Sequence, residues 1–247
     1  MPPVARSLRD EGGEIPETGG DVHGGQGLQG ALLWLMAHET DWAEATELQI
    51  LDAVLNLAPA QGWTWPMVRA AGKACGLSVA ETELLVPHGP ADLAALLSRR
   101  HDGAEMARLA DVDPKTLKIR ERIRAGVEAR LDAAAADEAA VRRWAGYLAL
   151  PTRMPLAIKL LWESADGLWR WAGDTATDEN HYSKRAILSG ILVSGLAIRL
   201  ANGKAEAMAF VDGRIENVMA YEKWKAGLKG GDLLRDVAAA LGKMRYG

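Results

Sequence analysis

Helical periodicity interrupted by proline and glycine is the feature that most constrains how this chain can fold. From about residue 44 onward, apolar residues recur at three- and four-residue spacing within stretches rich in Ala, Leu, Arg and Glu, which favour helix. Strict alternation of apolar and polar residues is scarce, and the chain has one Phe and four Tyr. The sequence therefore predicts an all-α fold, a bundle of about ten helices.

Helix boundaries can be placed by their capping and breaking residues. A first helix over residues 44–58 ends at Pro59, and a second begins after Thr64 as N-cap. Ser78 followed by Glu81 has the spacing of a capping box and opens a short third helix. Later helices are expected over 90–107, from 113, from 137, from 155, over 179–201, over 205–226 and over 232–245.

The beginning of the chain and its overall charge limit the location and the partners. Residues 1–43 are mostly a Gly-rich, acidic stretch that we expect to be a disordered tail without a signal peptide or presequence. The longest apolar run, residues 186–198, is shorter than the about 20 residues that span a bilayer. A net charge of -4 gives no long-range attraction to nucleic acid. These features predict a bacterial cytoplasmic protein.

Residues 50–100 resemble the helix-turn-helix module of TetR-type regulators, within a helix-turn-helix-like module over 44–100. The segment has an opening helix, a QGW turn, a helix ending in ACGLS, a short helix and then a long one. In a DNA-binding version, the short helix carries basic or hydroxyl side chains that contact phosphates and bases. Here that helix reads VAETELLV, with Glu81 and Glu83. We therefore expect no binding to nucleic acid, and a ligand-responsive TetR-type repressor is the alternative function.

A second segment, LWRWAGDTATDENHYSKRAILSGILVSG over residues 168–195, is similar to the signature of the ubiquinone-biosynthesis accessory family. The similarity extends over about residues 47–226 and includes the ALPTRMPLAI turn. The matching positions are Trp169, Trp171, Ala172, Gly173, Asp174, Asp178, Asn180, Tyr182, Lys184 and Arg185.

This resemblance implies a function that composition alone does not show. Members of the family are non-enzymatic homodimers on a TetR-like scaffold that hold isoprenoid quinone lipid in an apolar cavity, without a cofactor. They present quinone precursors to the di-iron demethoxyubiquinone hydroxylase or a related ring hydroxylase. The resemblance implies a TetR-like lipid-binding domain over 44–226. It places the partner contact at Asp166, Leu168, Trp169, Asp178, His181, Tyr182 and Arg185, with Arg185 supporting the patch and His181 standing where many members have Trp.

The helix over 179–201 is apolar nearly all round, and its glycines and serines leave two interpretations open. Small residues permit close helix crossing in a core or dimer interface, or they leave room for a ligand. For the second case, the expected lipid-binding residues are Trp162, Leu188, Ile191 and Leu192.

The last helix, within residues 231–247, is predicted to be amphipathic. Its apolar face consists of Leu233, Leu234, Val237, Leu241 and Met244, and basic residues stand at its end. This pattern is typical of a helix that lies on a membrane surface, which suggests peripheral attachment to the inner face of the bacterial membrane. Packing on the protein body is the alternative, because Asp232 and Asp236 weaken attraction to anionic lipids.

A metal-dependent enzyme is the third hypothesis. Asp174, Asp178, Glu179 and His181 are ligand types close together in sequence, although capping of the helix over 179–201 explains them better. The letters Gly25-x-Gly27-x-x-Gly30 match a dinucleotide fingerprint, but no strand precedes them, so we interpret the match as coincidence. No HExxH, CxxC, GxSxG or Walker pattern occurs. Cys75, the single cysteine, is expected to be a buried structural thiol. We therefore predict no catalytic residues, no metal and no cofactor.

Overall fold

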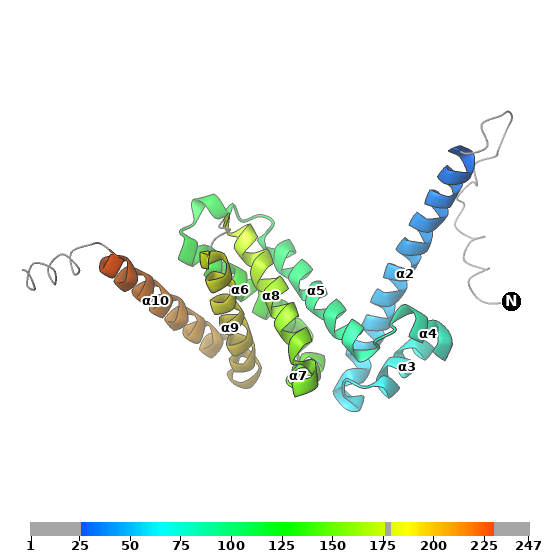
Figure 1. The fold of residues 1–247 in the computed structure, drawn as a ribbon. Coiled ribbons are helices and arrows are strands. Elements are labelled where there is room, and N and C mark those ends of the chain that lie inside the picture. The colour runs from blue at the N-terminus through cyan, green and yellow to red at the C-terminus, as the bar shows by residue number, and fades with distance from the viewer. Residues whose placement is uncertain (1–25, 176–178, 230–247) are drawn as a thin grey trace, which may run out of the picture. The chain divides into compact units, whose positions relative to one another are not determined.

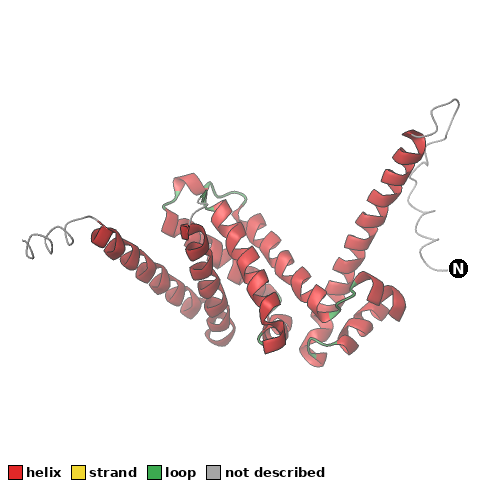
Figure 2. Ribbon diagram, viewed as in Figure 1, coloured by secondary structure: helices red, strands yellow, loops and turns green. Residues whose placement is uncertain are grey.

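The computed structural model describes residues 26–175 and 179–229. Within these ranges it contains nine α-helices and two short 3-10 turns and no strand (Figure 1, Figure 2). The predicted all-α class is confirmed, and the arrangement is consistent with a TetR-like bundle. The expected last helix, with Leu233, Leu234, Val237, Leu241 and Met244, lies outside the described residues.

The first described helix begins earlier than expected. α2 spans Gln26–Gln61, so residues 26–43 are helical where we predicted a mostly disordered tail. Glycine is concentrated before this point, whereas the segment GALLWLMAHETDWAEA is rich in Ala, Leu and Met, which have high helix propensity. The chain divides into two compact units, residues 1–46 and residues 47–247, and α2 contributes to both.

Three helices after α2 form the helix-turn-helix-like module, namely α3 (Trp65–Ala74), α4 (Val79–Leu85) and α5 (Pro90–Leu109). The predicted caps are confirmed, because the Met67 amide donates to Thr64 Oγ1 at 3.4 Å. Ser78 and Glu81 form the capping box, in which each side chain accepts from the other residue's amide, at 3.2 and 2.8 Å. The module packs on a core that includes Ile50, Leu51, Val54, Met67, Val68, Leu93 and Leu97.

The remaining helices are α6 (Ile119–Ala136), α7 (Glu138–Leu148), α8 (Met154–Trp171), α9 (Glu179–Asn202) and α10 (Lys204–Lys229). One predicted boundary is wrong. Asp113 caps only the 3-10 turn η1 (Pro114–Thr116), accepting from the Lys115 amide at 2.9 Å. The α-helix begins at Ile119, where the Glu121 side chain accepts from the Lys118 amide at 2.9 Å. A second cap downstream therefore sets the start of this helix.

Helix α9 packs against α6, α8 and α10. The shared core contains Val127, Leu168, Leu188 and Val211. The stretch His181–Asn202 of α9 is long and apolar enough to cross a membrane, so the expectation from the shorter run over 186–198 is corrected. Because α9 packs against several helices, its apolar character also serves the packing of the bundle.

Helices α6 and α8 approach closely at Gly126. A Cβ added there would lie 2.7 Å from Leu168 Cγ, whereas a Cβ at Gly146 of α7 would meet nothing within 4 Å. Both glycines lie inside helices, where alanine is intrinsically favoured by about 1 kcal/mol. The two positions therefore form a matched pair.

We expect Gly126→Ala to lower the free energy of unfolding by about 1–3 kcal/mol, because the buried Leu168 must move away from the added methyl group. Gly146→Ala should raise it by up to about 1 kcal/mol. Urea denaturation followed by circular dichroism measures both changes. Equal effects of the two substitutions would show that the α6–α8 contact is not tight.

Candidate functional site: two cavities beside helix α9

A buried arginine joins α8 to α9. The side chain of Arg185 is 2 % exposed. Its Nε donates to Asp166 Oδ1 at 2.6 Å, and its Nη1 donates to Asp174 Oδ2 and to the His181 carbonyl, each at 3.1 Å. Because a buried guanidinium is tolerated only when it is paired and hydrogen-bonded, the two carboxylates fix where α9 begins relative to α8.

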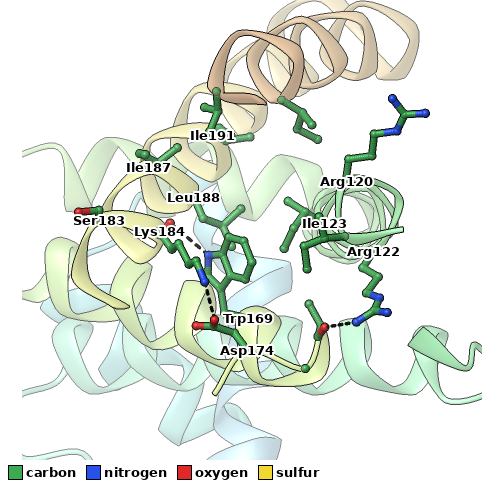
Figure 3. Close-up of a pocket in the computed structure, with 15 residues that line it drawn as sticks. Arg120, Arg122, Ile123, Trp169, Asp174, Ser183, Lys184, Ile187, Leu188 and Ile191 are labelled. Carbon is green, nitrogen blue, oxygen red and sulfur yellow. Dashed lines mark hydrogen bonds and ion pairs between the residues drawn. The ribbon is translucent and has the colours of Figure 1, made fainter. Parts of the chain in front are cut away.

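The neighbouring residue Lys184 extends this network. Its Nζ donates to Asp174 Oδ1 at 2.7 Å and lies 5.3 Å from the centre of the Trp169 ring, a cation–π distance. The Trp169 indole Nε1 donates to the Lys184 carbonyl at 3.1 Å (Figure 3). The signature positions Trp169, Asp174, Lys184 and Arg185 thus form one connected polar cluster between the two helices.

Three members of this cluster, Trp169, Asp174 and Lys184, line a cavity of about 450 Å³, which we call the first cavity. Figure 3 shows Trp169 and Leu188 on one side and Ile123 of α6 opposite. Its apolar lining comes from Ile119, Ile123, Trp169, Ala172, Ile187, Leu188, Ile191, Ile215 and Val218. Helices α6, α8, α9 and α10 all contribute to the lining.

Basic side chains stand at the rim of the first cavity. Arg122 is anchored, because its Nε donates to the Leu117 carbonyl at 2.9 Å and its Nη1 to the Ala172 carbonyl at 2.7 Å. Arg120 is exposed, and Lys184 is the third basic residue of the lining. An apolar interior with a cationic rim suits an amphiphile whose polar end carries oxygen atoms.

The predicted lipid-binding residues fall in three different places. Leu188 and Ile191 line the first cavity. Leu192 lines a second cavity on another face of α9. Trp162 lines neither, because its ring lies against His181 and Tyr182, with ring centroids 6.4 and 6.0 Å away. Consecutive residues of a helix point about 100° apart, which explains why neighbours on α9 serve different cavities.

The predicted partner-contact residues divide into exposed and buried groups. Tyr182 is 64 % exposed and contacts His181 edge-on, so both are accessible to a partner. Leu168 is 0 % exposed under Gly126 and cannot be touched from outside, which corrects its assignment. Asp178 lies outside the described residues.

The other three of these residues have internal roles. Arg185 is buried, in line with a supporting rather than a contacting role. Asp166 is held by Arg185 and by Arg170, whose Nη2 lies 2.7 Å from Asp166 Oδ2. Trp169 belongs to the wall of the first cavity. A direct contact of these residues with a partner is therefore not favoured in this conformation.

The carboxylate of Asp174 forms ion pairs with Lys184 and Arg185. Among the side chains that the structure describes, residues 42–175 and 181–218, no three His, Cys, Asp or Glu are grouped as metal ligands would be. Cys75 is half-buried, and burial raises the pKa of its thiol. The metal-enzyme hypothesis therefore gains no support from the part of the chain that is described.

The second cavity, of about 440 Å³, was not predicted from the sequence. It lies among α5 to α9, and its lining is more apolar than that of the first cavity. Its polar lining consists of Ser98, Arg130 and Ser164. The sequence could have indicated this cavity, because these polar residues lie at inward positions of their helices. Buried polar groups mark either a hydrogen-bond network or a ligand site.

A buried polar cluster lies behind the second cavity. Arg130 Nε donates to Asp102 Oδ1 at 2.8 Å, and Ser164 Oγ donates to the same oxygen at 2.7 Å. Burial raises the pKa of the Glu105 carboxyl to about 8. Arg130 opposes this shift, and Asp102 adds a smaller upward effect. Burial and Arg130 lower the pKa of His101 to about 4, although its Nε2 lies 2.9 Å from Asp137 Oδ2.

The helix-turn-helix-like module offers little to DNA. Within α4, Glu81 is used in the capping box, and the helix has no basic residue. Arg69 of the preceding helix α3 is paired with Glu83 at 2.9 Å. Phosphate binding needs free cationic side chains, so the repressor alternative is not favoured by this surface.

These features define a class of all-helical protein in which apolar cavities lie beside one helix, α9, and buried ion pairs hold that helix to α8. The model of the COQ9 family matches residues 154–222, which cover α8, α9 and part of α10. The mitochondrial ubiquinone biosynthesis protein COQ9 of Rattus norvegicus is 27% identical over 194 residues, 73% of this chain and 62% of that protein. The Homo sapiens protein is 25% identical over 194 residues, 73% of this chain and 60% of that protein. COQ9-A of Xenopus laevis is 25% identical over 210 residues, 79% and 62% of the respective chains.

These matches confirm the resemblance stated from the sequence, and the chain is similar to the COQ9 ubiquinone-biosynthesis proteins. The chain spans about three fifths of the length of these relatives. The predicted bacterial cytoplasmic location at the inner face of the membrane is contradicted, because the relatives are named as mitochondrial proteins. The predicted hydroxylase partner, homodimer and peripheral membrane contact stay predictions.

The pairing of Arg185 with Asp166 and Asp174 should contribute to the free energy of unfolding. We expect Asp174→Asn to lower the free energy of unfolding by about 3 kcal/mol, because it leaves Arg185 buried with one carboxylate fewer. Glu138→Gln is the control: it breaks the half-exposed pair with Arg142 and should cost less than about 1 kcal/mol. Urea denaturation of the three proteins measures both values. Equal losses would contradict a structural role for Asp174.

Glu105 should make stability depend on pH. Because its pKa is higher in the folded state than the ordinary 4.5, its stabilising contribution is complete below about pH 4.5 and is lost as the pH rises through about 8. Glu105→Gln removes this titration. We therefore expect the variant to gain on the order of 3 kcal/mol over the natural protein between about pH 6 and pH 9, measured by urea denaturation. A pH-independent difference would show that Glu105 is ionised in the folded protein.

Proposed function

We propose that this protein is a non-enzymatic lipid-binding accessory factor of ubiquinone biosynthesis, which holds an isoprenoid quinone intermediate in the first cavity. The relatives are named as ubiquinone biosynthesis proteins, and the family match covers the helices α8 and α9 that bound this cavity. The observation that carries the proposal is that the signature residues Trp169, Asp174 and Lys184 form the wall of an apolar cavity. These signature residues therefore line a cavity in addition to joining α8 and α9.

The chemistry of the first cavity matches an isoprenoid with an oxygenated ring. Burying apolar carbon contributes about 0.8 kcal/mol per methylene group, so a few carbons of the tail against Leu188, Ile191 and Ile215 provide useful affinity. Arg120 and Lys184 at the rim can donate to the oxygen atoms of a ring head. The anchored Arg122 keeps positive charge at the same rim.

The proposed route for handing over the lipid is a surface of aromatic side chains next to the cavity. Trp162, His181 and Tyr182 contact one another, and the next two residues along α9, Ser183 and Lys184, line the first cavity. Trp and Tyr are among the residue types that dominate binding energy in protein interfaces. This aromatic surface is therefore where we place the ring hydroxylase that receives the quinone intermediate.

The proposal can be tested with one substitution that fills the first cavity. Ile187 lines the cavity and is partly exposed, so Ile187→Trp can occupy the cavity without overpacking the core. Ala186→Trp is the control, because Ala186 is exposed and lies outside the lining. The proteins are purified, extracted with organic solvent and analysed by mass spectrometry.

The natural protein and Ala186→Trp should yield an isoprenoid in comparable amount, and Ile187→Trp should yield at least about fivefold less, since a filled cavity loses the apolar burial that holds the tail. Circular dichroism establishes that all three are folded. Absence of isoprenoid from the natural protein, together with normal ubiquinone levels in cells lacking it, would overturn the proposed function.

A further inference from the structure

The rim of the first cavity carries more positive charge than the neighbouring carboxylates neutralise. Among the described residues that line the cavity, Arg120, Arg122 and Lys184 are basic, and Asp174 is the one acidic residue. Asp174 is shared between Lys184 and the buried Arg185, so it neutralises neither arginine of α6. Within the part of the chain that the structure describes, no carboxylate forms an ion pair with Arg120 or Arg122.

The acidic side chains closest to these arginines are already in use. Glu121, which stands between them in the sequence, accepts a hydrogen bond from the Lys118 amide at 2.9 Å and so caps α6. Asp212 of α10 pairs with Arg124 at 2.7 Å. The positive charge of the two arginines at the rim is therefore left to be met by solvent ions or by an anionic ligand.

Arg122 is held in place without losing its charge. Its two hydrogen bonds go to the Leu117 and Ala172 carbonyls, which are neutral acceptors. A guanidinium has five N–H donors, so further donors remain for a ligand. The neighbouring Gly173 has a φ of +87°, and a Cβ there would lie 3.4 Å from Arg122 Nη1. A glycine at this position therefore leaves the guanidinium accessible from the α8 side.

The other basic side chains approach the cavity from two sides. Figure 3 shows Arg120 and Arg122 on α6, across the cavity from Lys184 of α9. Arg120 is exposed and makes no hydrogen bond with another described residue, so its long side chain can turn toward a ligand. A phosphate group carries a charge of about −1.5 to −2 and three strong acceptor oxygens, which can accept from donors on several sides.

Below this rim the cavity is apolar. Ile123, Leu188, Ile191 and Ile215 line it, and Ile187 at the mouth is 38 % exposed. A chain compound can therefore bury its tail among these side chains while its end group stays at the basic rim. Surplus cations above an apolar cavity favour an amphiphile whose end group is an anion with more than one negative charge.

We propose that the first cavity binds a chain lipid of isoprenoid type that ends in a phosphate group, with Arg120 and Arg122 as the phosphate-binding residues. This site rests on the proposed function for its apolar tail, and it adds a second class of ligand to the same cavity. Two sources offer the same chemistry, an isoprenyl phosphate and the headgroup of a membrane phospholipid.

Titration calorimetry of the full chain tests this site with farnesyl phosphate, farnesoate and farnesol, each below the concentration at which it forms micelles. The three probes have the same carbon chain and end in a phosphate, a carboxylate and a hydroxyl. We expect farnesyl phosphate to bind at least about tenfold more tightly than farnesol, the gain typical of a hydrogen bond between charged groups, with farnesoate in between. Added salt should narrow this difference, because it screens the attraction.

A fourth probe separates the two sources of phosphate. Oleoyl lysophosphatidate carries its phosphate on a glycerolipid. Tighter binding of farnesyl phosphate would assign the site to isoprenyl phosphates, and tighter binding of lysophosphatidate would assign it to a membrane phospholipid.

Three variants locate the phosphate. Arg120→Gln should weaken farnesyl phosphate about three- to tenfold and leave farnesol unchanged, because Arg120 is exposed and the fold does not depend on it. Arg122→Gln should act in the same direction. Since Arg122 also joins two carbonyls, circular dichroism must show that this variant is folded, and otherwise Arg120→Gln alone decides. Arg99→Gln is the control, because Arg99 is exposed on α5 outside the lining.

Three results would overturn the phosphate site. Equal affinity for farnesyl phosphate and farnesol would do so and would leave the proposed function standing. Farnesyl phosphate binding that Ile187→Trp leaves unchanged, or that Arg99→Gln weakens as much as Arg120→Gln, would place the phosphate elsewhere. Binding of no probe would also overturn the site, and extraction of isoprenoid from the natural protein then decides separately whether the proposed function stands.

Discussion

The structure around α9 depends on the pairing of Arg185 with two carboxylates of the α8 region. Desolvating a guanidinium costs several kcal/mol, and Asp166 at 2.6 Å and Asp174 at 3.1 Å offset that cost only in one relative position of the two helices. The pairing therefore contributes more to defining a unique arrangement than to net stability. Trp169 and Lys184 are held by the same arrangement, and with them the wall of the first cavity.

Fixing α9 in this way also decides what its apolar side chains face. Leu188 and Ile191 meet α6 and α10 around one cavity, and Leu192 and Leu196 meet α7 and α8 around another. A helix that is apolar nearly all round would usually be surrounded by tightly packed neighbours. Here two voids replace part of that packing, and this is the physical basis for proposing that the protein carries ligands.

The two cavities differ in the charge balance of their polar groups. The first has a cationic rim whose members, Arg120 and Lys184, are partly open to solvent, so it suits the head of an amphiphile. The second has an inner end where Arg130 is already balanced by Asp102. Surplus positive charge that can attract an anionic head group therefore lies at the first cavity and not at the Arg130 end of the second.

The sequence by itself determined the helices and the family resemblance. Caps such as Thr64 and the Ser78–Glu81 box are local, so their residues suffice to place a helix end. The early start of α2 and the late start of α6 were missed, because Gly-rich neighbours and a competing cap obscured the local signal. Leu188 and Ile191, which were predicted to bind lipid, line the first cavity, since apolar spacing on α9 identifies inward positions.

Only the tertiary structure decided which inward residues share a space. Leu192 was separated from Leu188, and Leu168 was buried under Gly126 instead of lying on a surface. The second cavity and its Arg130 end depend on five helices that are distant in sequence. Spacing along one helix fixes the direction of a side chain, whereas a void exists only where several helices fail to fill the space between them.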